Sequence, residues 1–533
     1  MRKFKKLGVF IDMSRNAVMT VETLKKFFIY LAKMGYNFAM LYTEDTYEVT
    51  EEPYLGYLRG RYTKEELKEL DDFAYGLGIE LMPCIQALAH YDAFVRWGQV
   101  PVDSDVTLLV DEPRVYEFLE NCIKTCRECF RSHYIHINMD EARGLGKGKH
   151  LKKYGYEPQI DIFSRHLARV NELLKKYDFN AIMASDMFFN IVTENGAYTQ
   201  PKRDMPKEAK DAVPDDVVLV YWEYYFRGDK QWVYEGMLDN HKQLTDNVWF
   251  LGCAWTWCGL LPNNDFSIDA TTLALNACRM KKIDNIFFGM FGDDGGECSR
   301  FAVLPSLYKT AQMAKGNYDE EKIRRGFRRL FGAEFDAFLS LDKLNYLIKD
   351  WTFDDGVPKM ALYNDYFVGI CDIRLLEGQR EYIQSVADEW HAYAKKYRKW
   401  AFLFESAACL ADVLAIKYDL GVLTRAAYKA GDKETLRRLA NEDYATVKKC
   451  VERYAAAYEK QWMTENKPFG FEVQHARLGG LVLRTDACRR RLLDYVNGKI
   501  DKIEELEAEL LPITRFQGNP GFWYSKIITP GRY

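Results

Sequence analysis

The sequence lacks the features that mark membrane proteins, exported proteins and nucleic-acid-binding proteins. None of its 533 residues belong to an apolar run near the length of about 20 residues that spans a bilayer. The basic start MRKFKK is followed by a short apolar run, residues 7–11, which Asp12 ends too early for a signal peptide. The formal net charge is only −4, and like charges form no block. These absences argue against a nucleic-acid partner and a membrane segment, and predict a soluble, cytoplasmic protein.

A disulfide framework is also missing, because the 12 cysteines are scattered through apolar surroundings. Cys122, Cys126 and Cys129 have the C-x3-C-x2-C spacing of the iron–sulfur site in S-adenosylmethionine radical enzymes. They lie, however, in the amphipathic pattern VYEFLENCIKTCRECF, where offsets of four and seven place all three on one helix face. We therefore expect reduced thiols in the core, with the radical enzyme as a distant alternative. No HxH or HExxH spacing occurs at the predicted strand ends, so neither a metal nor another cofactor is implied.

Eight short apolar runs alternate with longer amphipathic stretches over the first 300 residues. Such alternation is typical of a parallel sheet with helical crossovers, and eight strands are the number in a (β/α)8 TIM barrel. No nucleotide-type glycine loop follows the first run, which favours a closed barrel over a doubly wound sheet. The predicted strands lie within residues 7–15, 38–45, 79–86, 134–142, 181–189, 217–225, 249–257 and 286–294.

Strand signals end after about residue 305, where helical periodicity takes over. We predict an α/β protein with a catalytic (β/α)8 barrel over residues 1–309 and an α-helical C-terminal domain over residues 310–533. The helical domain either completes the site or forms a homodimer contact, and the sequence favours neither. Each apolar run ends in polar or aromatic residues, which places the expected site at the carboxyl ends of the strands.

Two neighbouring carboxyl groups, Asp140 and Glu141, follow the fourth run. A glycosidic bond is usually cleaved between two carboxyl groups about 5–10 Å apart, and strand alternation points adjacent side chains apart unless the backbone curls. Such a pair suits a reaction in which one carboxyl group is the acid and the other holds a nucleophile carried by the substrate. Taken alone, the pair is also typical of a solvated strand end or a helix cap.

The residues around this pair resemble a motif of glycoside hydrolase family 20, the β-N-acetylhexosaminidases. The run from His136 to Glu141 is similar to H-x-G-G-D-E, with Asn138 and Met139 at the two glycine positions. The resemblance implies that Glu141 is the acid and base, and that Asp140 orients the 2-acetamido group of the substrate.

Other strand ends extend the resemblance. Asp12 and Arg15 fit the family's Asp-x-x-Arg, which implies that Arg15 binds hydroxyls of the terminal sugar; the alternative is a structural ion pair with Asp12. Glu44 and Asp45 resemble the family's paired acids, and His90 resembles its histidine. The resemblance implies a relay from Glu44 through His90 to Glu141. A core histidine is the alternative interpretation of His90.

Tyr221 resembles the tyrosine that hydrogen-bonds the acetamido carbonyl, and Glu223, two residues on, shares its strand face and is expected to reach a sugar hydroxyl. Trp255 and Trp257 also share a face; in the lumen they would form an aromatic shelf, although cores produce the same pattern.

Two positions depart from the family. Ala184 replaces a tryptophan of the acetamido pocket, and Phe291 with Asp293 stands where the family has W-x-E or W-x-D. Phe291 keeps an aromatic wall and Asp293 is expected to read a hydroxyl, while the space at Ala184 stays open or is filled by Phe188, Trp255 or Trp257.

The sequence thus predicts an exo-acting, retaining β-N-acetylhexosaminidase that removes terminal β-linked GlcNAc or GalNAc from small molecules or oligosaccharides. A retaining exo-glycosidase with another 2-substituent, and a sugar-binding protein without turnover, are the alternatives.

Overall fold

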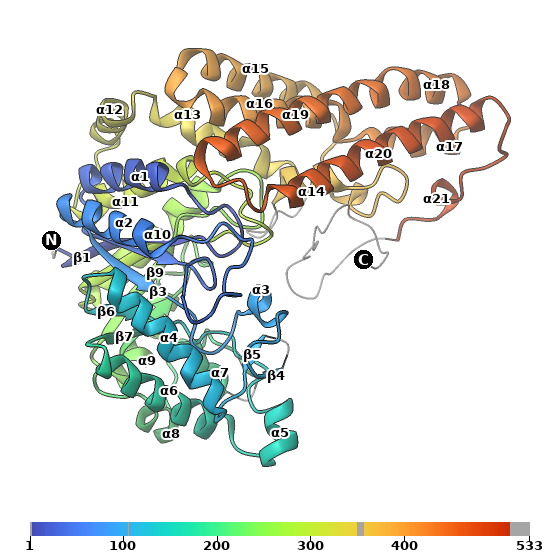
Figure 1. Ribbon diagram of the computed structural model, residues 1–533. Helices are drawn as coiled ribbons and strands as arrows, with labels where there is room; N and C mark the ends of the chain where they lie inside the picture. Colours follow the sequence, from blue (N-terminus) through green and yellow to red (C-terminus); the bar gives the residue numbers. More distant parts are fainter. Residues whose placement is uncertain (1–2, 105, 194, 349–355, 512–533) are drawn as a thin grey trace. The chain divides into compact units, whose positions relative to one another are not determined.

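The computed structural model describes residues 3–104, 106–193, 195–348 and 356–511 (Figure 1). The chain divides into two compact units, here called the barrel unit and the helical unit. The barrel unit contains Met1–Trp255, Asp265–Phe291 and Ser306–Gly326, and the helical unit contains Thr256–Asn264, Gly292–Pro305 and Phe327–Tyr533. Residues 512–533 of the predicted helical domain lie outside the described residues.

Eight parallel strands close into a barrel in the order β1-β10-β9-β8-β7-β6-β3-β2. Each predicted run contains most of one of these strands, which confirms the (β/α)8 class. The strands are β1 (Lys6–Asp12), β2 (Phe38–Tyr42), β3 (Glu80–Cys84), β6 (Tyr134–His136), β7 (Asn180–Ala184), β8 (Val218–Trp222), β9 (Val248–Cys253) and β10 (Asn285–Met290).

Helices follow the strands and are delimited by local signals. In α1 (Val21–Met34), the Thr20 side chain accepts a hydrogen bond from the Thr23 N–H at the start, and Gly35 ends the helix at φ 96°. Thr63 and Glu66 form a capping box at the start of α2 (Lys64–Gly76). The remaining helices up to residue 331 are α3 (Asp92–Val95), α4 (Pro113–Cys129), α5 (Lys149–Tyr154), α6 (Gln159–Lys176), α7 (Asp186–Asn190), α8 (Lys207–Asp211), α9 (Gln231–Leu244), α10 (Asn264–Met280), α11 (Leu304–Ala314) and α12 (Glu320–Phe331).

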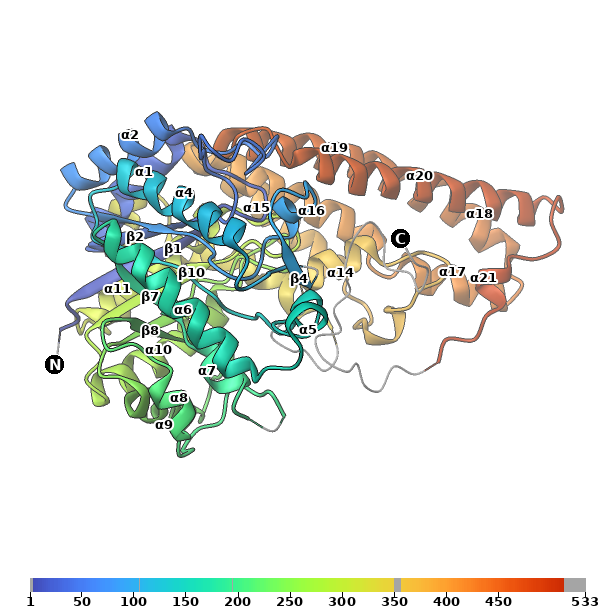
Figure 2. The ribbon, with the colours of Figure 1, turned by 60° about the horizontal axis from the view of Figure 1, so that its bottom comes forward.

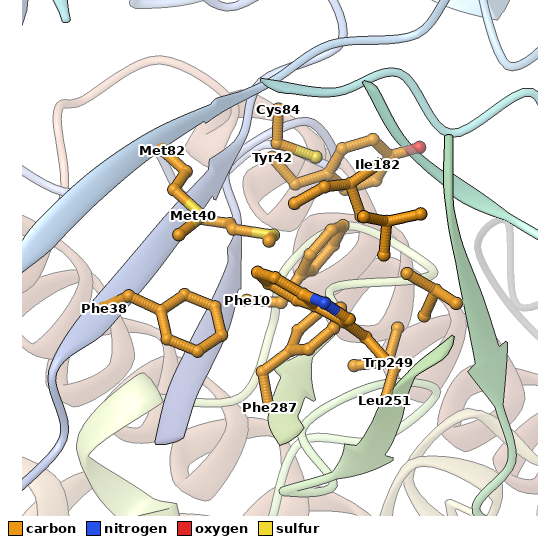
Figure 3. Packing of buried hydrophobic residues seen from close by; sticks show 12 residues of the cluster. Phe10, Phe38, Met40, Tyr42, Met82, Cys84, Ile182, Trp249, Leu251 and Phe287 are labelled. Atoms are coloured by element: carbon orange, nitrogen blue, oxygen red, sulfur yellow. The ribbon is translucent and has the colours of Figure 1, made fainter. Parts of the chain in front are cut away.

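Alternate side chains of the strands fill the barrel (Figure 3). Phe38 and Met40 of β2 point inward with Trp249 of β9 and Phe287 of β10, and the rings of Phe38 and Trp249 pack edge to face at 5.7 Å. Because the lumen is filled with apolar side chains, polar chemistry is confined to the strand ends.

Helix α4 carries the three cysteines with the cluster-like spacing. Cys122, Cys126 and Cys129 are buried on the regular helix, and burial raises the pKa of the Cys122 thiol to about 12 and that of Cys129 to about 11. All twelve cysteines are free thiols, and only Cys258 is partly exposed. The predicted buried thiols are confirmed, with this one exception.

The helical unit contains pairs of long helices. Helices α19 and α20 run side by side (Figure 2), and α16 packs against both α15 and α19. In the described part of the chain, no helix is both long and apolar enough to cross a membrane. The helices of the helical unit are α13 (Phe335–Leu339), α14 (Val357–Tyr363), α15 (Arg380–Lys396), α16 (Ala401–Lys417), α17 (Leu420–Lys429), α18 (Lys433–Asn441), α19 (Asp443–Glu465), α20 (Phe471–Val496) and α21 (Glu504–Glu507).

A buried ion cluster lies within the helical unit. Lys359 Nζ is 2.6 Å from Glu297 Oε2 and 3.3 Å from Asp294 Oδ2, and Arg477 donates to Glu297 Oε1 at 2.6 Å. Lys359 and Glu297 are almost inaccessible to solvent. The cluster fixes the GDDGGE segment to α14 and α20, because removing one partner leaves buried charge unbalanced.

Candidate active site

The backbone curls directly after β6, where the two adjacent carboxyl groups lie. Asn138, Met139 and Glu141 have φ of 53°, 63° and 51°, in the left-handed region that favours glycine. The Asn138 side chain donates to the Ile85 carbonyl at 2.7 Å and so supports this conformation. The two positions where the family motif has glycine are therefore left-handed here, although neither residue is glycine. The curl lets both carboxyl groups turn toward the same neighbour.

That neighbour is His90, which follows β3. Its Nε2 lies 3.3 Å from Asp140 Oδ2 and 3.6 Å from Glu141 Oε2. Both are ion-pair contacts. Burial opposes a charged imidazole, but the Asp140 carboxylate outweighs it and raises the pKa of His90 to about 9. In turn, His90 holds the pKa of Asp140 below its usual range, although burial acts in the opposite direction.

Arg15 lies beside Glu44 at the ends of β1 and β2. Arg15 NH1 is 3.4 Å from Asp12 Oδ2 and 3.3 Å from Glu44 Oε1, and Tyr42 donates its hydroxyl to Glu44 at 2.6 Å. Burial raises the pKa of Glu44 to about 7. The charge of Glu44 also raises the pKa of His90, so the two predicted relay residues interact electrostatically.

Gln86 links this group to the carboxyl pair. Its Nε2 donates to the Tyr42 hydroxyl at 2.9 Å and to Asp140 Oδ1 at 3.0 Å. The side chain is fully buried. The only feature of the sequence that pointed to Gln86 is its position at the end of the third predicted strand.

Asp186 is a second residue that the sequence did not assign to the site. Its Oδ2 accepts hydrogen bonds from the Glu141 N–H at 3.0 Å and from Asn190 Nδ2 at 3.3 Å. Burial, together with the negative charge of Asp140, raises the pKa of Asp186 to about 7. The fully buried Asp186 therefore holds the backbone of Glu141 from the start of α7.

A cavity of about 480 Å³ lies beside Glu141, within the size range of small-ligand sites. At the rim of this cavity, Arg143 NH2 donates a hydrogen bond of 2.9 Å to Glu141 Oε1. The cavity is lined by Glu141, Arg143, Lys147, Gln159, Asp186, Met187, Asn190, Ile191, Asn195, Gly196, Tyr198 and Trp222.

Trp222 supplies an aromatic wall in this cavity near the end of β7, where Ala184 lies. Its ring packs 4.7 Å from that of Tyr198 and is stacked 5.7 Å from that of Tyr224. Phe188, in contrast, is fully buried and packs against Phe163 of α6, so it does not line this cavity.

The predicted positions of Tyr221 and Glu223 need correction. Tyr221 lies on the outer face of β8, with its ring 4.8 Å from His241 of α9, because the side chains that point into the lumen are those of Val218 and Val220. The tyrosine is completely buried and cannot contact an acetamido group there.

The side chain of Glu223 is also occupied by contacts within the protein. Its carboxylate accepts hydrogen bonds from Thr199 Oγ1 at 3.0 Å and from the N–H groups of Tyr224 and Tyr225 at 3.0 and 3.1 Å. The residue is 2% exposed, and burial raises its pKa to about 7. Glu223 therefore anchors the loop after β8, in place of the sugar contact expected of it.

The remaining predicted residues differ in position. Phe291 packs 5.4 Å from Phe10 and 5.9 Å from Tyr224, at the end of the lumen. Trp255 is buried against Tyr225 and Phe266. Trp257, which was expected to form a shelf with Trp255, belongs to the helical unit, and so does Asp293, which follows Phe291 in the family motif. Among the described residues, no group of three or more His, Cys, Asp or Glu side chains has the arrangement of a metal site.

Comparisons with known proteins agree with the motif. The model of the glycosyl hydrolase family 20 catalytic domain matches residues 8–238, and that of the glycoside hydrolase 20C C-terminal domain matches residues 336–522. A search of curated proteins gave no match.

Solved structures similar to this chain include an exo β-N-acetylglucosaminidase from Vibrio harveyi, with a TM-score of 0.47 and 16% identity over 64% of this chain and 58% of that one. A β-N-acetylhexosaminidase from Bacteroides fragilis gives 0.46 and 20%, over 62% and 70%. An N-acetyl-β-hexosaminidase from Streptomyces plicatus gives 0.44 and 16%, over 62% and 69%. The chain thus spans less than two thirds of the Vibrio protein. With family models matching both its barrel and its helical region, the chain belongs to glycoside hydrolase family 20.

Proposed function

We propose that the protein is an exo-acting, retaining β-N-acetylhexosaminidase that cleaves terminal β-linked GlcNAc or GalNAc with assistance from the substrate. The observation that carries the proposal is the pair Asp140 and Glu141, which both contact His90 Nε2 after the left-handed curl. Two carboxyl groups that share one neighbour are badly placed to attack a sugar from opposite faces. They are well placed to serve the leaving oxygen and the 2-acetamido group on one side of the anomeric carbon.

In the first step, Glu141 donates its proton to the glycosidic oxygen while the acetamido oxygen attacks the anomeric carbon. The bond to the leaving group breaks with its electron pair on that oxygen, and a positively charged oxazolinium forms on the sugar. Asp140 accepts a hydrogen bond from the amide N–H and stabilises this charge. Its lowered pKa keeps the carboxylate ionised at neutral pH, as the role requires.

In the second step, the Glu141 carboxylate removes a proton from water as the water oxygen attacks the anomeric carbon. The oxazolinium opens, the acetamido group is restored, and the product keeps the β configuration. Glu141 regains its proton and is ready for another cycle.

Binding of the terminal sugar rests on side chains around this pair. We propose that Arg15, held by Asp12 and Glu44, donates to sugar hydroxyls. The hydroxyl contact of Asp293 stays a prediction from the sequence. Ala184 stands where the family has a tryptophan, and Trp222 takes over as the aromatic wall of the pocket. The Trp222 ring then borders the acetamido methyl group. A cytoplasmic location fits the twelve free thiols, and a homodimer stays a prediction from the sequence.

Hydrolysis of p-nitrophenyl β-N-acetylglucosaminide and galactosaminide tests this proposal. We expect turnover that a thiazoline analogue of the oxazolinium inhibits, and much slower cleavage of the matching 2-hydroxy glucoside. Turnover that ignores the thiazoline would contradict substrate assistance, and equal rates on 2-acetamido and 2-hydroxy substrates would favour another exo-glycosidase. Binding without turnover would indicate a sugar-binding protein.

A further inference from the structure

We infer that Tyr54, Tyr57 and Trp97 form a carbohydrate-binding surface, called here the aromatic platform, for sugar units beyond the terminal one. The inference rests on the proposed function and adds to it that the preferred substrate is an oligosaccharide. These residues come from the two loops that follow β2 and β3, and therefore lie on the same face of the barrel as the carboxyl pair.

The three rings pack against one another yet remain open to solvent. Their centroids lie 6.0 Å apart for Tyr54 and Tyr57, 5.8 Å for Tyr54 and Trp97, and 5.5 Å for Tyr57 and Trp97. The side chains are 41%, 44% and 37% exposed. Large aromatic side chains are normally buried, so a cluster with this exposure at a loop tip indicates a binding surface.

The loops that present the rings are fixed before any ligand arrives. Glu52, close to Tyr54, is buried and accepts hydrogen bonds from Arg114 NH1 at 2.8 Å and Asn121 Nδ2 at 3.0 Å, both on α4. In the Trp97 loop, Phe94 is stacked 5.0 Å from Phe118 of α4. A rigid platform loses little conformational freedom when a sugar binds.

Direct contacts join the platform loops to the catalytic site. Arg59 donates to Asp45 Oδ1 at 3.0 Å and also to the carbonyl of Ser14, next to Arg15. Gly56 lies against the Asp45 carbonyl so closely that a Cβ atom there would be 2.1 Å from the oxygen.

The loop that carries Trp97 also contains His90, whose Nε2 is 3.6 Å from the carboxylate of Glu141. This loop therefore borders the proposed acid. Because the acid protonates the leaving-group oxygen, and the further sugars of an exo-cleaved chain belong to that leaving group, those sugars come close to this loop.

The exposed area fits sugars better than a second protein chain. Three aromatic side chains of about 200 Å² each, two fifths exposed, offer about 250 Å². A stable protein interface needs about 800 Å² on each partner. An area of about 250 Å² suits one or two pyranose rings, whose C–H faces stack on aromatic rings.

Kinetics on two substrates test the platform. Methyl β-N-acetylglucosaminide has no ring beyond the terminal sugar, whereas the β-1,4-linked trisaccharide of N-acetylglucosamine has two. We expect Tyr57→Ala and Trp97→Ala to lower kcat/KM for the trisaccharide about threefold to tenfold, and to leave the methyl glycoside unchanged. Trp97→Tyr should restore most of the loss.

Tyr156→Ala is the matched control, because Tyr156 is 83% exposed and should affect neither substrate when replaced. Equal losses on both substrates, or no loss on either, would overturn the inference. A loss on both accompanied by a lower sedimentation mass would also overturn it, because the rings would then join two copies of the chain. If the wild type hydrolyses neither substrate, it is the proposed function that fails.

Discussion

At the scale of single residues, the site is marked by strained backbone. Glu44, His90 and Glu141 have φ of 46°, 59° and 51°, and none of them is glycine. A left-handed conformation costs an L-residue about 1–2 kcal/mol, so these positions persist only because their surroundings enforce them. Three of the four predicted catalytic residues share this property, which supports a functional role for the set.

Asp186 holds one of these strained residues in place, because its carboxylate accepts a hydrogen bond from the Glu141 N–H. We expect Asp186→Ala to lower kcat about 10- to 100-fold with a smaller change in KM, because a charge-assisted hydrogen bond is worth about 1.5–3 kcal/mol. Asp186→Asn keeps an acceptor oxygen and should lose less. Asp211→Ala is the control, because it removes an exposed carboxylate that pairs with Lys207 on α8, outside the site. Equal activity of all three variants would contradict the positioning role.

His90 predicts a dependence of stability on pH. Its pKa is about 9 in the folded chain, against about 6.5 for an unfolded histidine. Its contribution is therefore complete below pH 6.5 and is lost as pH rises through 9. Urea unfolding of the wild type and His90→Gln should show a stability difference that shrinks by about 3 kcal/mol between pH 6 and pH 9.5. A difference that stays constant over this range would show that His90 is not charged in the fold.

At the scale of elements, the sequence predicted every barrel strand, because each combines an apolar run with a polar end. The hairpin of β4 (Val102–Ser104) and β5 (Thr107–Leu108) was missed, since two or three residues give no periodicity. Tyr221 was assigned to the wrong face because a shift of one residue reverses the direction of every side chain in a strand. The contact between Asp186 and Glu141 spans 45 positions and leaves no local pattern.

The missed hairpin positions the loop after the carboxyl pair. Asp103 of β4 accepts hydrogen bonds from the N–H groups of Gly146 at 2.6 Å, Gly148 at 3.1 Å and His150 at 2.8 Å. We expect Asp103→Ala to lower the free energy of unfolding by about 2–4 kcal/mol and to reduce kcat. Chemical denaturation and steady-state rates measure the two effects. Asp229→Ala, at an exposed carboxylate, should change neither; an Asp103 variant that also behaves as wild type would contradict this role.

At the scale of the whole molecule, the two compact units correspond to two family-model matches, one over the barrel and one over the helical region. The order of these parts is predictable from the sequence, because the periodicity changes near residue 305. The sequence did not predict that each unit contains segments from both halves of the chain. Thr256–Asn264 and Gly292–Pro305 belong to the helical unit, whereas Ser306–Gly326 belongs to the barrel unit. Such an exchange depends on tertiary contacts, which local periodicity does not report.

The buried cluster around Glu297 should control the stability of the helical unit. Glu297→Ala leaves Lys359 and Arg477 without their shared carboxylate, and we expect a loss of about 3–5 kcal/mol. Thermal unfolding followed by circular dichroism, dominated here by helices, measures it. Glu459→Ala, at a half-exposed side chain of α19, is the control. An unchanged midpoint for the Glu297 variant would contradict the account of the cluster.

The central claim is that the acetamido oxygen of the substrate is the nucleophile, held by Asp140 while Glu141 supplies the proton. The direct measurement is kcat/KM for p-nitrophenyl β-glucosaminides whose N-acyl group is acetyl, fluoroacetyl, difluoroacetyl or trifluoroacetyl. Fluorine withdraws electrons from the amide oxygen, so the account predicts a steep fall in rate along the series, to well below one hundredth for trifluoroacetyl. Rates that are independent of fluorine content would contradict it.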